Sequence, residues 1–373
     1  MLQRLYLHNF RCLENFELTL KEMPSALLIG KHGVGKSTIR SALEVLQSIG
    51  RGINRVKNLV RPKDLAWGRS EVPMRFEIEV LLDNKLYKYI VAFELPENFK
   101  ELRVFEEELI VAGEQIYSRK EAQVALNKGY PTSSGNSEAQ FLVDWHLVAL
   151  PLIQKRSQTD PIHIFKTWLA RTIILAPIPS LMTGDSNGET LEPEPNASNF
   201  AEWFSGLLSR YPAAYTQLDR YLQEVMPDIK DFLNEAIGKD SKNTLVRFEK
   251  NSASLSVFFE DLSEGEKCFF LIAVVLAANQ FYGPLFCFWD EPDNFIPLSK
   301  VGDFVFSLRR SFENAGQVLV TSHNPEAIQK FSDENTFLLD RKSHLEPTIV
   351  RLLSDLSIPG DLIETLILGD IEL

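Results

Sequence analysis

The fold is decided by one stretch near the N-terminus, Ser25-Ala26-Leu27-Leu28-Ile29-Gly30-Lys31-His32-Gly33-Val34-Gly35-Lys36-Ser37-Thr38. Its first five residues form an uninterrupted, mostly apolar run, which is typical of a central strand in a sheet. The following residues fit the pattern GxxxxGK[ST], and the apolar spacing after Thr38 predicts a helix directly behind them. In a strand, loop and helix of this kind, backbone N–H groups at the helix N-terminus can surround phosphate oxygens. A glycine-rich turn without a ligand is the alternative interpretation.

The motif assigns a role to each of its polar side chains. Lys36 would reach the β- and γ-phosphates, Ser37 would bind Mg²⁺, and Thr38 would contact the α-phosphate side. The other loop residues would contribute mainly backbone groups to the cofactor site: Gly30, Lys31, His32, Gly33, Val34 and Gly35.

Two later apolar segments are followed by side chains that can transfer a proton or bind a metal ion. Asp290 and Glu291 follow the apolar run 285–289, so that Asp290 could hold Mg²⁺ and Glu291 could accept a proton from attacking water. His323 follows the apolar strand 318–321, where a neutral imidazole could sense the γ-phosphate. Solvated strand ends and a structural histidine are the alternatives.

A third motif lies between these segments and the phosphate loop. Ser263 and Glu266 have the spacing of a capping box that starts a helix, and Gly265 lies between them. A capped helix start that contains glycine is also an anion-binding site, so the two interpretations are compatible.

Composition limits the class of protein. The chain has 373 residues, which predicts one enlarged domain or a core with an additional lobe. No apolar run is long enough for a membrane helix and the first residues do not form a secretory signal, so we expect a cytoplasmic protein without membrane contact. Three widely spaced cysteines, expected to be buried thiols, are Cys12, Cys268 and Cys287.

The charge distribution bears on nucleic-acid binding. With 39 Lys and Arg against 51 Asp and Glu, the formal charge of −12 argues against a uniformly basic surface. One local basic segment remains as a possible DNA contact, with a solvated loop as its alternative: Arg51, Arg55, Lys57, Arg61, Lys63 and Arg69.

In the rest of the chain, the spacing of apolar residues predicts the secondary structure. Alternation over 72–117 predicts an antiparallel meander, and residues 140–171 and 200–224 are expected to be helical. Prolines interrupt this helical region, which argues against a long coiled-coil arm. From residue 244 the chain returns to alternating strands and helices.

The order of these motifs resembles that of ABC-type ATPases, and is most similar to their RecF/SMC-like branch, often catalogued as AAA-family or OLD-like ATPases. Leu7-His8-Asn9-Phe10-Arg11 looks like the N-terminal strand of that branch. The resemblance implies an α/β head with a mixed sheet flanked by helices, an antiparallel β-lobe and a helical insertion. The corresponding domains are 1–125 for the N-terminal half, 126–243 for a mainly helical insertion, and 244–373 for the C-terminal half.

The resemblance also implies ATP and Mg²⁺ as cofactors and a nucleotide-linked dimer. ATP at Lys36 and Ser37 of one copy would be covered by Ser263, Gly265 and Glu266 of the other, with Arg11 near the nucleotide. The segment after Pro292 lacks the Leu-Asp or Leu-His pair common in the family, and no glutamine stands out as the Q-loop residue. The OLD members of the family append a Toprim nuclease domain, which we do not expect in this chain.

Three functions remain open. The first is an ATPase that acts as sensor and scaffold for a separate nuclease or toxin in anti-phage defence. The second is a RecF-like ATPase that binds DNA during repair or recombination. The third, the ATPase subunit of a transporter, is disfavoured because residues 262–266 read Leu-Ser-Glu-Gly-Glu rather than LSGGQ.

Overall fold

A computed structural model describes residues 1–127, 139–237 and 241–356. The chain divides into two compact units that are interleaved in sequence. Unit 1 comprises Met1–Met23, Gly30–Thr172 and Phe337–Leu373, and unit 2 comprises Pro24–Ile29 and Ile173–Thr336. Each unit contains residues from the predicted N-terminal half, 1–125, and from the predicted C-terminal half, 244–373. The segment boundaries at residues 125 and 243 remain a prediction from the motif positions.

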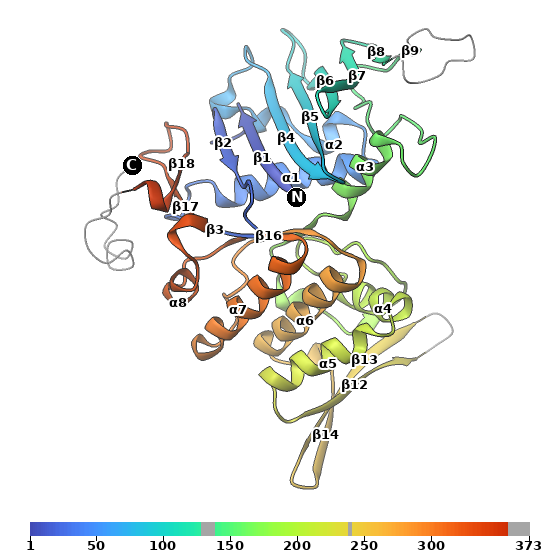
Figure 1. The fold of residues 1–373 in the computed structure, drawn as a ribbon, viewed down its shortest axis with the longest axis vertical. Helices are drawn as coiled ribbons and strands as arrows, with labels where there is room; N and C mark the ends of the chain where they lie inside the picture. The colour runs from blue at the N-terminus through green and yellow to red at the C-terminus, as the bar shows by residue number, and fades with distance from the viewer. Residues whose placement is uncertain (128–138, 238–240, 357–373) are drawn as a thin grey trace. The chain divides into compact units, whose positions relative to one another are not determined.

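Unit 1 is built on an eight-stranded sheet in the order β2-β1-β4-β5-β6-β7-β8-β9 (Figure 1). All of its neighbouring strands are antiparallel. The strands are β1 (Leu2–His8), β2 (Phe16–Thr19), β4 (Met74–Leu82), β5 (Lys85–Glu94), β6 (Arg103–Val111), β7 (Glu114–Lys120), β8 (Gln123–Leu126) and β9 (Ala139–Leu142).

The expected meander is confirmed and forms the middle of this sheet. Asp83 and Asn84 connect β4 to β5, and both have positive φ angles, of 47° and 60°. Two consecutive residues of this kind are the hallmark of a tight hairpin turn that matches the twist of the strands. The other α-helices and strands of unit 1 are α1 (Lys36–Gly50), α2 (Val56–Leu59), α3 (Pro161–Arg171), β17 (Thr336–Asp340), whose first residue belongs to unit 2, and β18 (Ile349–Leu352).

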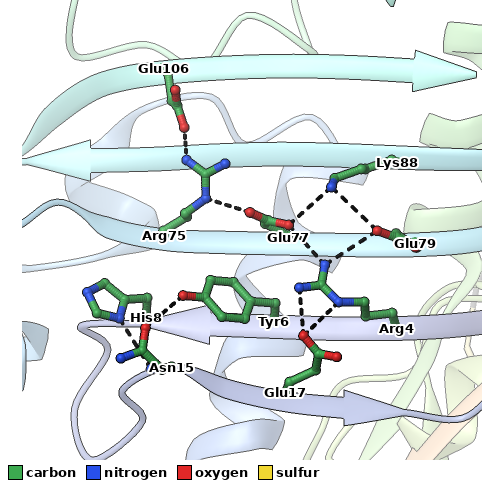
Figure 2. Close-up of polar contacts among 10 residues, drawn as sticks. All are labelled: Arg4, Tyr6, His8, Asn15, Glu17, Arg75, Glu77, Glu79, Lys88 and Glu106. Carbon is green, nitrogen blue, oxygen red and sulfur yellow. Dashed lines mark hydrogen bonds and ion pairs between the residues drawn. The ribbon is translucent and has the colours of Figure 1, made fainter. Parts of the chain in front are cut away.

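One face of this sheet carries a network of opposite charges (Figure 2). Arg4 on β1 lies between Glu17 on β2, at 2.8 Å, and Glu77 on β4, at 3.0 Å. Arg75 connects Glu77 to Glu106 on β6. Such partly exposed pairs contribute about 0–1 kcal/mol each, so the network aligns strands more than it stabilises the unit.

A buried carboxylate fixes the segment that follows β9. Glu107 on β6 is fully buried and accepts hydrogen bonds from the backbone N–H groups of Ala149 and Leu150 and from the hydroxyls of Tyr89 and Tyr117. Burial raises the pKa of Glu107, although these hydrogen bonds oppose the increase. The carboxylate therefore holds residues 149–150 in a non-helical conformation.

The expectation of a helix over 140–171 is wrong for its first part. Only α3 is helical there, and it begins at Pro161 because Asp160 caps it by accepting the N–H of Ile162 at 3.0 Å. The second expected helical region is confirmed as α4 (Phe200–Arg210) and α5 (Ala214–Val225).

Unit 2 contains a parallel set of strands in the order β10-β15-β16-β3. These strands are β3 (Ser25–Ile29), β10 (Ile173–Leu175), β15 (Phe286–Trp289) and β16 (Gln317–Thr321), and all of their residues are buried. A second, antiparallel sheet consists of β11 (Asp185–Ser186), β12 (Ile229–Ala236), β13 (Lys242–Lys250) and β14 (Ala253–Phe258). Because both units combine sheets with helices, the expected α/β class is confirmed.

Helices of unit 2 pack around α6 (Glu264–Tyr282), which is buried over almost its whole length (Figure 1). It contacts α4, α5 and α7 (Leu298–Asn314), while α8 (Pro325–Gln329) contacts α7. Phe270 of α6 packs against the rings of Phe204, Phe232 and Phe259. All three cysteines are free and buried, as expected from their spacing. Among the described helices, none has the length and apolar character needed to cross a bilayer.

Candidate functional site

The glycine-rich loop in unit 1 has the backbone geometry that its motif requires. Gly33 and Gly35 have φ angles of 81° and 104°, a region that side chains with a Cβ atom disfavour. Gly35 is the N-cap of α1, and no side chain caps the helix. Glycine has no side chain with which to cap the helix, and a helix start of this kind suits an anionic ligand.

Lys36 is buried within this loop. Its ammonium group donates to the carbonyl oxygens of Gly30, at 2.7 Å, and Lys31, at 3.1 Å. The charge is thus held among backbone groups of the loop, where it is available to a phosphate. Ser37, in the first turn of α1, is exposed.

Arg11 lies beside the first turns of the same helix. Its guanidinium donates to Asp64, at 2.9 Å, and to the hydroxyl of Ser41, at 3.0 Å, while Ser41 donates to the carbonyl of Ser37. Unit 1 therefore brings Arg11, Lys36 and Ser37 to one end of α1.

Unit 2 places the two carboxylates and the histidine at the carboxyl ends of β15 and β16. These strands are parallel neighbours, so the residues that follow them meet at one edge of the sheet. Thr321, at the end of β16, is fully buried. Its hydroxyl donates to Asp290 Oδ1 at 2.7 Å and accepts the backbone N–H of Glu291 at 2.9 Å.

Glu291 and His323 form a close pair. The distance between Glu291 Oε1 and His323 Nε2 is 3.2 Å, and each side chain is 31% exposed. Asn294 donates to the other carboxylate oxygen, Glu291 Oε2, at 2.6 Å. A partly exposed carboxylate held by an imidazole and an amide can orient and deprotonate a water molecule, which is the geometry that general-base catalysis needs.

Several residues at this site were not expected from the sequence. Thr321 and Asn294 orient the two carboxylates, and Ser322 donates to the buried Asp293 at 2.8 Å. Burial raises the pKa of Asp293, with Ser322 opposing the increase. The Asp293-Asn294 pair follows Asp290 and Glu291 after Pro292, and this proximity in sequence was the available signal.

The third motif forms the expected capping box at the start of α6. Glu266 Oε2 accepts the backbone N–H of Ser263 at 2.8 Å and its hydroxyl at 2.6 Å. A carboxylate thus already occupies the donors of Ser263 that an external anion would use.

The basic segment divides into two groups in unit 1. Arg51 donates to the carbonyl of Ala170, and Arg69 forms an ion pair with Glu14 at 2.8 Å, so both serve the fold. The other four cations are exposed, and none of them forms an ion pair within the described part of the chain: Arg55, Lys57, Arg61 and Lys63.

Comparison with solved structures identifies the fold. The chain is similar to an Smc head bound to the C-winged helix domain of ScpA, with 15% identity and a TM-score of 0.56, over 95% of this chain and 98% of that one. It is also similar to an Smc head domain with an extended coiled coil, bound to the C-terminal domain of ScpA derived from Pyrococcus furiosus. That comparison gives 13% identity and a TM-score of 0.53, over 99% of this chain and 98% of the other. Both show the head fold expected from the motifs.

Comparison of the sequence identifies the family. No protein of curated function matches the chain. A family model described as "AAA domain, putative AbiEii toxin, Type IV TA system" matches residues 25–329, from β3 to the end of α8. The chain therefore belongs to this AAA-domain family and has the fold of an SMC head domain.

Proposed function

We propose that the chain binds ATP with Mg²⁺ and hydrolyses it slowly to ADP and phosphate. The observation that carries the proposal is the pairing of Glu291 with His323 at 3.2 Å, beside Asp290, in a family of AAA domains. The glycine N-cap of α1 and the buried Lys36 support phosphate binding in the same chain.

Each residue has a defined part in the proposed reaction. Lys36 and the loop amides hold the β- and γ-phosphates, and Arg11 adds positive charge near the first turns of α1. Ser37 and Asp290 would each offer an oxygen ligand to Mg²⁺, which would supply positive charge against the phosphates. Glu291 takes a proton from the attacking water, and His323 orients Glu291 and senses the γ-phosphate.

Two variants test this proposal. Lys36→Ala is expected to abolish ATP binding, because the loop loses its only buried ammonium among the described residues. Glu291→Gln keeps the size of the side chain but cannot accept the proton, so turnover is expected to fall by about 100-fold or more while ATP still binds. Wild-type turnover in either variant would refute the assignment. Binding by fluorescence titration and phosphate release separate the two effects.

We further propose that ATP links two copies of the chain. The family resemblance predicts that Ser263, Gly265 and Glu266 of one copy cover the nucleotide of the other. In this role the backbone N–H and hydroxyl of Ser263 exchange their present acceptor, the carboxylate of Glu266, for an oxygen of the partner copy's nucleotide. In this arrangement ATP binding acts as a switch, and hydrolysis resets it.

The partner we propose is a separate effector, a nuclease or a toxin, in anti-phage defence. The family description, which names a putative toxin of a type IV toxin–antitoxin system, connects the family of the chain itself with toxin systems and supports a defence role to that extent. Co-purification with the product of a neighbouring gene and loss of protection under phage challenge in Lys36→Ala cells are the expected results. A protein without such a partner and without effect on phage survival would contradict this role.

A second candidate function is DNA binding through the basic segment. The four exposed cations Arg55, Lys57, Arg61 and Lys63 favour it, because clustered unpaired charges can engage phosphates even on an acidic protein. Reversing Arg55, Lys57 and Arg61 to glutamate should weaken DNA binding and flatten its salt dependence. Reversing Arg51 and Arg69 is not a suitable control, because both support the fold. An unchanged binding curve would exclude this function.

A further inference from the structure

The segment 341–348, which connects β17 to β18, contacts the glycine-rich loop within unit 1. The buried Thr348 donates its hydroxyl to the carbonyl of Val34 at 2.7 Å, and its backbone N–H to the carbonyl of Cys12 at 3.0 Å. Arg341 donates to the carbonyl of Gly33 at 3.5 Å. Two successive carbonyl groups of the loop are therefore bonded to a segment more than 300 residues away in sequence.

The contacts around Thr348 leave little room for other arrangements. A Cβ atom at Gly35 would lie 2.9 Å from Thr348 Oγ1 and 2.8 Å from Cys12 Sγ, both closer than carbon atoms normally approach. Cys12 in turn contacts Thr38 Oγ1 at 3.6 Å. Residues from the N-terminal and C-terminal parts of the sequence thus meet at Gly35.

The segment is itself held in place. Arg341 donates to the carbonyls of His344, at 2.6 Å, and Glu346, at 2.8 Å, and Trp67 donates to the carbonyl of His344 at 3.2 Å. Arg341 therefore links the internal turn of the segment to Gly33. Thr348 is anchored independently of the glycine-rich loop by its backbone N–H, which donates to the carbonyl of Cys12 at 3.0 Å, and its side chain is buried.

Peptide geometry connects these contacts to phosphate binding. In a planar trans peptide, the carbonyl of one residue and the N–H of the next point in opposite directions. A hydrogen bond to the Val34 carbonyl therefore turns the N–H of Gly35 away from Thr348, and a bond to the Gly33 carbonyl turns the N–H of Val34 away from Arg341. Amides oriented in advance bind an anion without the loss of freedom that a mobile loop would suffer.

We propose that Thr348 is a positioning residue that orients the amides of the glycine-rich loop for the phosphates of a nucleotide. Arg341 supports the neighbouring carbonyl in the same way. The consequence for nucleotides rests on the proposed ATP site, whereas the effect on the loop itself does not.

The test compares two buried threonines. Thr348→Val removes the hydroxyl and nearly keeps the volume, and Thr348→Ser retains the hydroxyl. Thr336→Val is the matched control, because Thr336 is buried and donates its hydroxyl to a backbone carbonyl, that of Ser332, at 2.9 Å in unit 2. Both valine variants should therefore lose similar stability.

Only the Thr348 variant should affect the loop. In the chain without nucleotide, hydrogen exchange of a peptide covering residues 30–36 should be several-fold faster in Thr348→Val than in wild type or Thr336→Val. In titrations with a fluorescent ATP analogue, Thr348→Val should bind roughly three- to tenfold more weakly, the range expected for one neutral hydrogen bond. KM should rise with kcat unchanged, and Thr348→Ser should restore wild-type values.

Hydrogen exchange tests the positioning role of Thr348, and ATP binding tests the proposed nucleotide site. Unchanged exchange in residues 30–36 of Thr348→Val would overturn the positioning role, as would equal changes in Thr336→Val. Faster exchange confined to Thr348→Val, in a protein that binds no ATP, would uphold the effect on the loop and refute the proposed nucleotide site. Should Thr348→Val fail to fold, Arg341→Gln provides the same comparison at the Gly33 carbonyl.

Discussion

Replacement of Thr321 by valine tests how Asp290 and Glu291, the carboxylates of the proposed reaction, are held. The hydroxyl of Thr321 is the donor to Asp290 at 2.7 Å and the acceptor of the Glu291 N–H at 2.9 Å, and the residue is fully buried. Valine has nearly the same volume but cannot form either bond, so both partners lose a buried contact.

The magnitude follows from these two bonds. A hydrogen bond to a charged group contributes about 1.5–3 kcal/mol and a neutral one about 0.5–1.5 kcal/mol. Thr321→Val should therefore reduce the free energy of unfolding by about 2–4 kcal/mol. Glu291 also has a φ angle of +49°, a conformation that is unfavourable for a residue with a side chain. Without the bond to Thr321 its backbone can relax, which would move its carboxylate away from His323.

Denaturant unfolding and ATP turnover measure the two effects separately. We expect kcat to fall at least about tenfold in Thr321→Val, with Thr321→Ser close to wild type in both measurements. If Thr321→Val loses stability but keeps wild-type kcat, Thr321 does not position the catalytic groups. A loss below about 1 kcal/mol would show that the two hydrogen bonds are weaker than the geometry implies.

Two further predictions concern charge. Burial would raise the pKa of Glu77, but hydrogen bonds from Arg75 and Arg4 oppose burial and lower the pKa overall. The ionised carboxylate therefore stabilises the folded state at pH values above the ordinary glutamate pKa of about 4.3. This stabilisation is lost as the pH falls through the lowered pKa of Glu77 in the folded state. The stability difference between wild type and Glu77→Gln, measured by urea unfolding, should accordingly shrink as the pH is lowered below about 4.5; a constant difference would contradict the pairing. Glu266→Gln keeps an acceptor for Ser263 but removes the negative charge from the start of α6, so ATP-dependent dimerisation should become several-fold tighter at a cost of about 0.5 kcal/mol in stability. Weaker dimerisation of this variant in sedimentation experiments would show that Glu266 assists the partner nucleotide rather than competing with it.

The parts of the structure that local patterns determine could be predicted from the sequence. The strand before Gly30 and the helix that starts at Lys36 follow from an apolar run, a glycine-rich loop and a 3.6-residue period. The capping box of Ser263 and Glu266 likewise involves residues three apart. Each of these features lies within one turn or one strand, so no distant contact decides it.

Features that depend on distant contacts could not be predicted. The helix expected from residue 140 fails before Asp160, because Glu107 on another strand binds the backbone at residues 149–150. Thr321 bonds to Asp290 across two strands, 31 residues apart, and Thr348 bonds to Val34 across 314 residues. A threonine in a sequence gives no sign of which backbone or carboxylate group it will meet.

The most direct test of the central claim is the mass of the Glu291→Gln protein with and without ATP. We expect a monomer of about the 42.5 kDa chain mass without nucleotide and a dimer at saturating ATP and Mg²⁺, because ATP binds but is not hydrolysed. Adding Lys36→Ala to this variant should abolish the dimer. A Glu291→Gln protein that binds ATP yet remains a monomer would contradict the account.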